Sequence, residues 1–195
     1  MTAAEPLPAW AVPPPGGFTA EDLDRIPDLP PHTELIDGSL VLPNPQTYFH
    51  SLAGCLVQTG LHDTAPDSLR VVRNMTVTLG PRNRPEPDVM VLRAEAVTDE
   101  AEETGYRAED AVLVIEVVSP DSEERDRKRK PQLYAEAGIP HFWRVEKGEG
   151  RHPVVHVYEL DTTTGAYVPT GIHRDRLKLP VPFDIDIVLT TIDRL

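Results

Sequence analysis

The sequence predicts an α+β fold in which a mixed β-sheet packs against a small number of helices. Short apolar runs of strand length recur along the chain, and only three segments show helical spacing. At least one of these helices falls between two predicted strands, as in a mixed sheet. With 195 residues, 39% of them hydrophobic, the chain is long enough to bury one core without disulfides or metals.

The first residues differ in composition from the rest of the chain. Residues 1–17 are rich in proline, alanine and glycine, and they end at Pro13-Pro14-Pro15-Gly16-Gly17. Such a segment buries too little apolar surface to offset its loss of conformational entropy. We therefore expect a flexible arm at residues 1–17 and a single domain at residues 18–195. A short helix is expected to open the domain, from an N-cap at Thr19 to about Ile26.

A β-hairpin is predicted at residues 34–42, because Asp37-Gly38 separates two apolar runs and suits a tight turn. A helix is predicted from Tyr48 to Leu61, where apolar residues recur at helical spacing. An alternating strand is expected at residues 69–79, and an acidic loop at residues 94–110. Further strands are expected at 88–92, 112–118, 141–145, 154–160, 166–170 and 183–189, with a basic helix ending near Gly138.

The net charge of −13 argues against indiscriminate binding to nucleic acid, which favours a basic surface. Residues 1–34 contribute −5 and residues 95–110 contribute −6 of this charge, so most of it lies in two segments. The densest basic run, Arg125 to Lys130, is left as a local patch. The chain shows no signal sequence and no apolar run of membrane-spanning length, and its single cysteine, Cys55, fits a reducing compartment. We therefore expect a cytoplasmic protein that does not bind membranes.

Two carboxylates stand out because they accompany predicted buried strands. Asp88 opens the first strand, and Glu116 lies inside the apolar run Val114-Ile-Glu-Val-Val118. A buried carboxylate needs a partner or a cation, since leaving it unpaired is costly. On adjacent strands the two could hold Mg²⁺ or Mn²⁺, with the main-chain carbonyl of Val117 as a further ligand. Alternatively, Asp88 caps a turn after Pro87 and Glu116 pairs with an arginine.

The basic helix contributes one lysine that differs from its neighbours. With about 100° per residue, one third of the helix surface would carry Asp126, Lys130, Leu133, Tyr134 and Ala137. The apolar members make this the buried face, so Lys130 is expected in the site while the other basic residues face solvent. Pro131 leaves a second possibility, because the helix could begin there and Asp126 would then leave the face.

These segments, taken in order, resemble a known family. They are Glu34-Leu-Ile-Asp-Gly, His50 after a proline-rich turn, Pro87-Asp88-Val, Ile115-Glu-Val-Val-Ser-Pro, Asp126-x-x-x-Lys130-x-x-x-Tyr134-Ala and Gly138-Ile-Pro-His-Phe-Trp143. Over residues 30–190 the chain resembles the Uma2 family of endonucleases, which has the PD-(D/E)XK restriction-endonuclease-like fold.

The resemblance implies a central mixed sheet flanked by helices, with Asp88 and Glu116 as Mg²⁺ ligands and Glu34 as an additional catalytic acid. The chain departs from the pattern two residues after Glu116, where Val118 occupies the lysine position. Lys130 looks like its replacement, entering the site from the following helix.

The leading hypothesis is hydrolysis of phosphodiester bonds, most simply in DNA, with Mg²⁺ or Mn²⁺ held by Asp88 and Glu116. Lys130 would orient the attacking water or stabilise the transition state. Arg127, Lys128 and Arg129 are the candidates for binding backbone phosphates, and a homodimer is the default assembly. Two alternatives remain: a catalytically silent module with a nuclease fold, and an enzyme acting on a small phosphorylated molecule.

Overall fold

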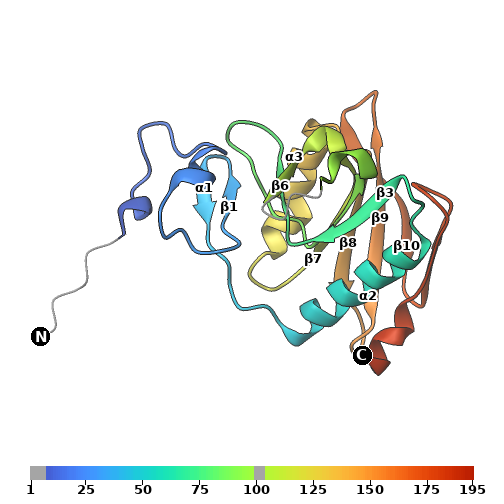
Figure 1. The fold of residues 1–195 in the computed structure, drawn as a ribbon. Helices are drawn as coiled ribbons and strands as arrows, with labels where there is room; N and C mark the ends of the chain where they lie inside the picture. Colours follow the sequence, from blue (N-terminus) through green and yellow to red (C-terminus); the bar gives the residue numbers. More distant parts are fainter. Residues whose placement is uncertain (1–7, 99–103) are drawn as a thin grey trace, which may run out of the picture.

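A six-stranded mixed sheet forms the centre of the protein (Figure 1). The computed structural model describes residues 8–98 and 104–195. The strands, in their spatial order, are β10 (Ala166–His173), β9 (Pro153–Asp161), β8 (His141–Lys147), β7 (Ala111–Val117), β5 (Val89–Arg93) and β3 (Leu69–Arg73). Neighbouring strands are antiparallel except β7 and β8, which are parallel. The predicted α+β fold with a central mixed sheet is confirmed.

The parallel pair is joined by the basic helical segment. Parallel neighbours require a crossover connection, usually a helix. Here a π-helical turn, Arg125–Arg129, continues into α3, Lys130–Glu136. The segment ends at Gly138, whose φ of 80° permits the left-handed turn into β8. This crossover brings the basic helix onto one face of the sheet, over β7.

The two faces of the sheet bury different sets of side chains, because alternate residues of a strand point to opposite faces. Leu113, Ile115 and Val117 of β7 belong to the core that packs under α2 (Tyr48–Thr64). That core also includes the small sheet of β11 (Arg176–Leu179) and β12 (Ile185–Val188) and the C-terminal 3-10 helix (Leu189–Arg194). Val114 belongs to the opposite core, with Tyr134 and Phe142. Glu116 therefore points to the face covered by α3.

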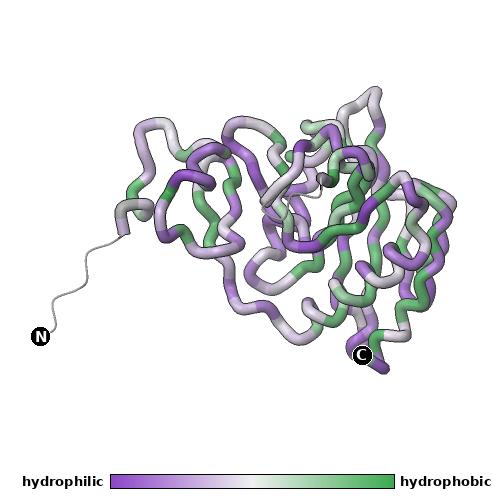
Figure 2. Tube along the Cα trace, in the orientation of Figure 1, coloured by the Kyte–Doolittle hydropathy of each residue, from purple (hydrophilic) through white to green (hydrophobic). Residues whose placement is uncertain are grey.

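Hydrophobic residues concentrate in the strands of the central sheet, as the green segments of Figure 2 show. The N-terminal part is more mixed and packs in a small cluster of its own, around Phe18, Ala20 and Leu35. Among the described residues, no helix is long and apolar enough to cross a membrane.

The predicted hairpin is confirmed as β1 (Glu34–Ile36) and β2 (Ser39–Val41). Its turn residues, Asp37 and Gly38, have φ values of 53° and 77°, as a two-residue turn of this kind requires. The short helix before it, α1, is confined to Asp22–Arg25. Of the predicted flexible arm, residues 1–7 lie outside the described residues and Ala9–Ala11 forms a 3-10 turn. The division of the chain at residue 17 stays a prediction.

Three elements differ from the sequence prediction. The strand expected at residues 69–79 is broken at Asn74, whose φ of 51° turns the chain after β3. Beyond this turn, β4 (Thr76–Thr78) pairs with β6 (Gly105–Arg107) rather than with the central sheet. The acidic loop thus contains β6 and short 3-10 turns at Ala94–Ala96 and Ala108–Asp110, while residues 99–103 lie outside the described residues. Strand β11 was not predicted.

Candidate active site

Glu116 and Asp88 meet at one end of the β5–β7 pair. Val89 lies opposite Ile115, so continuing this register by one residue places Asp88 opposite Glu116. The amide of Val117 donates a hydrogen bond of 2.7 Å to Oδ2 of Asp88, and Nε2 of His50 lies 3.2 Å from Oδ1. Glu116 is buried, with 2% of its surface exposed. Asp88 and Glu116 thus line the same cavity, and a metal shared between them stays a prediction.

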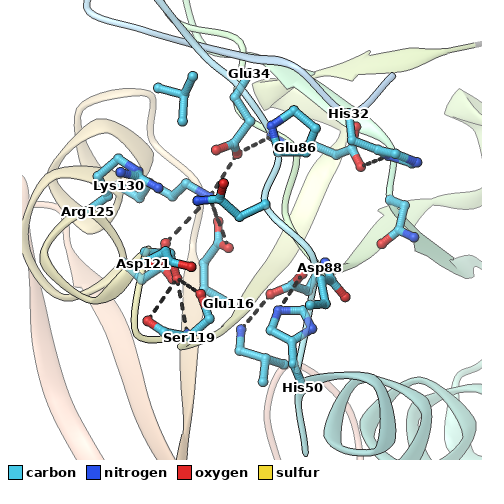
Figure 3. Close-up of a pocket in the computed structure, with 18 of the residues that line it drawn as sticks. His32, Glu34, His50, Glu86, Asp88, Glu116, Ser119, Asp121, Arg125 and Lys130 are labelled. Carbon is cyan, nitrogen blue, oxygen red and sulfur yellow. Dashed lines mark hydrogen bonds and ion pairs between the residues drawn. The ribbon is translucent and has the colours of Figure 1, made fainter. Parts of the chain in front are cut away.

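Lys130 connects three carboxylates that come from three different elements (Figure 3). Its Nζ atom lies 2.8 Å from Oε1 of Glu34, 3.1 Å from Glu116 and 3.5 Å from Oδ1 of Asp126. The hydroxyl of Tyr134, one turn further along α3, donates to Oε1 of Glu116. Glu34, Glu116 and Lys130 are thus brought together as predicted, and Asp126 joins them.

The π-helical turn resolves the question that Pro131 raised. The amide of Lys130 bonds to the carbonyl of Arg125, five residues earlier, which widens the turn just before the proline. In a regular α-helix the proline ring would press on the carbonyl four residues earlier. The helix therefore continues through Pro131, and both Asp126 and Lys130 are buried, at 1% and 4% exposed. Asp126 and Lys130 therefore share the buried face of the helical segment, as the sequence predicted.

A cavity of about 340 Å³ opens beside these side chains. Glu34, Asp88, Glu116, Asp126 and Lys130 all line it. Further lining residues, which the sequence pattern did not assign to the site, include His32, Glu86, Ser119, Asp121, Ser122 and Arg125. The cavity is therefore strongly acidic.

Burial and mutual repulsion shape the protonation of this cluster. Burial raises the pKa of Glu116 well above its ordinary value; Lys130 opposes that effect, and the carboxylates of Asp126, Asp88 and Glu34 add to it. Burial likewise raises the pKa of Asp126, against the influence of Lys130. For Lys130 burial acts to lower the pKa, but Glu116, Glu34 and Asp126 outweigh it and the pKa is raised well above the usual range. Lys130 therefore stays charged at neutral pH.

The donor set fits a divalent cation in charge and in atom type. The carboxylates of Glu34, Glu116 and Asp126 share the ammonium group of Lys130, and Asp88 lines the same cavity. Oδ1 of Asp126 is buried and has no hydrogen-bond partner among the described residues beyond its ion pair with Lys130. Hard carboxylate oxygens are the ligands that Mg²⁺ and Mn²⁺ prefer. Within the described ranges, no three His, Cys, Asp or Glu side chains form a ready-made metal cluster. Instead, Lys130 and Tyr134 donate hydrogen bonds to the oxygens of Glu116. To bind a metal, the carboxylate of Glu116 would have to give up at least one of these hydrogen bonds.

The three residues predicted to bind backbone phosphates do not line the cavity. Arg127 pairs with Glu146 at 2.8 Å, and Lys128 pairs with a glutamate one turn earlier at 3.3 Å. Arg129 holds the hairpin turn through two hydrogen bonds to Asp37, of 2.7 and 2.5 Å. These pairs lie on the outer side of the helical segment, and the role of the three residues in substrate binding stays a prediction.

Some functional candidates were missed or undervalued from the sequence. No role in the site was predicted for His50, yet its imidazole contacts Asp88. Glu86 lies two residues before Asp88, a spacing that places both side chains on one side of an extended segment. Its carboxylate lies 2.6 Å from Nδ1 of His32. That spacing was the available signal for Glu86, whereas His32 offered none.

Comparison with known proteins identifies the family of the chain. The family model for Uma2, described as "Putative restriction endonuclease", matches residues 20–191. The chain belongs to the Uma2 family. This match confirms the family resemblance noted in the sequence. The chain is therefore a nuclease-like protein. No match was found among curated proteins.

A solved structure shares the fold. It is that of a protein from Anabaena variabilis ATCC 29413, described as a putative nuclease belonging to DUF820, with a TM-score of 0.66 and 18% sequence identity. The match covers 90% of this chain and 97% of the other chain. The expectation that Lys130, in the adjoining helix, replaces a lysine at the position of Val118 stays a prediction.

Proposed function

We propose that this Uma2-family protein is a Mg²⁺-dependent or Mn²⁺-dependent nuclease that hydrolyses phosphodiester bonds in DNA. One observation carries the proposal: Lys130 lies within 2.8 to 3.5 Å of Glu34, Glu116 and Asp126, in an acidic cavity that also contains Asp88. Buried carboxylates with a fixed cation are typical of metal-assisted phosphoryl chemistry. Family membership and the shared fold support the same assignment.

The metal would be held by Asp88 and Glu116, with the carbonyl of Val117 as a further ligand. When bound, a divalent metal polarises the phosphate and lowers the pKa of the attacking water. Lys130 keeps its proton, because three carboxylates raise its pKa, and it can stabilise negative charge on the phosphate or orient the water. Glu34, which lies in β1, forms an ion pair with the ammonium group of Lys130.

The family pattern expects a lysine two residues after Glu116, where this chain has Val118. The position of Lys130 explains how a lysine can still act at this site. A side chain at Val118 would extend from the residue that follows β7, whereas Lys130 reaches Glu116 from the helix that covers this face of the sheet. Both routes bring an ammonium group beside the same carboxylate. The role of the lysine is therefore set by the position of Nζ rather than by its place in the sequence.

A cleavage assay tests the proposal. Supercoiled DNA and single-stranded RNA would be incubated with the protein in Mg²⁺ or Mn²⁺, and with EDTA as the metal-free control. We expect D88N, E116Q and K130Q each to lower the rate of DNA cleavage by about 10²-fold or more, since each removes one part of the electrostatic machinery. D63N, which changes an exposed carboxylate in α2, should keep wild-type activity. Cleavage that persists in EDTA, or that survives in D88N and E116Q, would contradict the proposal.

A catalytically silent module is the second candidate. It is favoured by Val118 in the lysine position and by the hydrogen bonds that already occupy the oxygens of Glu116. A silent module predicts no metal-dependent cleavage and no metal-dependent stabilisation that is lost in D88N.

A further inference from the structure

Arg125 differs from every other basic residue in its segment. Arg127, Lys128, Arg129 and Lys130 each have a carboxylate partner within ion-pair distance. Among the described residues, Arg125 has no ion pair, and its Nε atom is buried without a hydrogen-bond acceptor. Arg125 also lines the acidic cavity, whereas Arg127, Lys128 and Arg129 do not. The cavity is thus lined by an arginine that no described residue engages in an ion pair and whose Nε donor has no acceptor there.

A buried donor without an acceptor costs free energy, so such a group in a folded protein calls for an explanation. Asp121, one helical turn earlier, lines the same cavity, but no ion pair joins it to Arg125. The other nearby lining residues, Ser119 and Ser122, hydrogen-bond to each other. No residue in the described part of the chain therefore provides the missing acceptor.

The position of Arg125 indicates what the acceptor is. In Figure 3, Arg125 lies on the helix side of the cavity with Lys130, and Asp88 and His50 lie on the opposite side. A guanidinium group presents a planar fork of N–H donors that matches two oxygens of a phosphate. A phosphate group between the two sides would meet Arg125 on one side and Asp88, a candidate metal ligand, on the other.

We propose that Arg125 forms a phosphate-binding subsite of this cavity and that its ligand is a backbone phosphate of nucleic acid. The identity of the ligand rests on the proposed function, but phosphate binding by Arg125 does not require catalysis. Because Arg125 makes no ion pair or hydrogen bond within the described chain, its replacement removes no polar contact of the fold.

The test measures binding without metal. A fluorescent single-stranded DNA oligonucleotide would be titrated by anisotropy in EDTA, and inorganic phosphate by thermal unfolding against NaCl of equal ionic strength. We expect R125Q to bind at least about tenfold more weakly than wild type, which is the effect of one charge-assisted hydrogen bond. R125K should fall between the two, because it keeps the charge and loses the fork. R151Q removes an exposed arginine elsewhere and should bind as wild type does.

The two probes separate the possible sources of the phosphate. Weaker binding of the oligonucleotide alone supports a phosphodiester subsite, and weaker binding of both probes supports the same subsite for any phosphate group. The subsite is overturned if R125Q matches wild type with both probes, if R151Q is weakened equally, or if wild type binds neither probe. Failure of the proposed nuclease activity would look different: no cleavage in Mg²⁺ or Mn²⁺, with the Arg125-dependent binding in EDTA intact.

Discussion

Lys130 is the counter-ion for three buried or half-buried carboxylates that lie far apart in the sequence. Glu34 lies in β1, in the N-terminal part of the chain. Glu116 lies in β7, the strand that precedes the helical segment, and Asp126 lies one helical turn before Lys130. An uncompensated buried charge is strongly destabilising, so the fold depends on this one ammonium group.

Replacing Lys130 by methionine should therefore destabilise the protein, because Glu116 and Asp126 would be left buried without a cation. We expect the free energy of unfolding to fall by about 3–5 kcal/mol at neutral pH, measured by urea denaturation. K147M changes an exposed lysine at the end of β8 and should cost no more than about 0.5 kcal/mol. Equal, small effects of the two substitutions would show that Lys130 is not the main counter-ion.

Asp126 should show the opposite behaviour, because burial raises its pKa above the ordinary value of 3.8 in spite of Lys130. Folding then favours the protonated form, so the contribution of this group to stability is present below pH 3.8 and is lost as the pH rises through its folded pKa. At pH 7 the ionised carboxylate costs stability, and D126N removes that cost. We expect D126N to melt at a higher temperature than wild type at pH 7.

The difference in melting temperature between D126N and wild type should shrink as the pH is lowered toward 4, because the wild-type carboxyl group becomes neutral. D63N, at an exposed site, serves as the control and should show no comparable gain at pH 7. A lower melting temperature for D126N at pH 7 would mean that the charge of Asp126 stabilises the fold through Lys130.

At the level of single residues, the sequence was informative where a polar side chain interrupts an apolar pattern. Glu116 within β7 and Lys130 on the buried face of the helix were predictable for that reason. The ion pairs of Arg127 and Arg129 were not, since their partners Glu146 and Asp37 come from other elements that only the tertiary fold brings near. Arg125 is distinguished solely by the absence of such a partner among the described residues, which no sequence pattern records.

Among the elements, those with strong local signals were predictable. The Asp37-Gly38 turn predicted the hairpin, and the helical spacing of apolar residues predicted α2. The strand expected at residues 69–79 failed because its alternating pattern continues through Asn74, where the backbone turns into a left-handed conformation. The pairing of β4 with β6 also depends on contacts between distant segments, which an alternating pattern does not specify.

The packing of α2 against β12 offers a test at this scale. A methyl group added at Gly60 would lie 2.6 Å from Cγ1 of Ile187, too close for a carbon contact. We expect G60A to lower the free energy of unfolding by about 1–3 kcal/mol through overpacking, measured by chemical denaturation. A Cβ at Gly80 would meet no atom within 4 Å, so G80A is the matched control and should change stability little. A stabilised G60A would show that α2 can move away from β12 at little cost.

For the molecule as a whole, the mixed sheet and its helical crossover were predictable from the order of the elements. The arrangement of helices on both sides of the sheet was implied by the family resemblance. Net charge was the feature most open to misreading. The value of −13 argues against a nucleic-acid partner, but the structure places several acids around one cavity, where their charge would favour a bound cation. A divalent metal at these carboxylates would offset their negative charge and so strengthen the binding of a phosphate group beside them.

Thermal unfolding with and without Mn²⁺ or Mg²⁺ tests the central claim most directly. We compare wild type, the D88N/E116Q double variant and D63N at fixed pH and ionic strength. A ligand at 100 times its dissociation constant stabilises the folded state by about 2.7 kcal/mol, which for a chain of this size is a rise of several degrees. The account predicts this rise in wild type and D63N and its loss in the double variant. No rise in wild type, or an equal rise in the double variant, would contradict a metal site at Asp88 and Glu116.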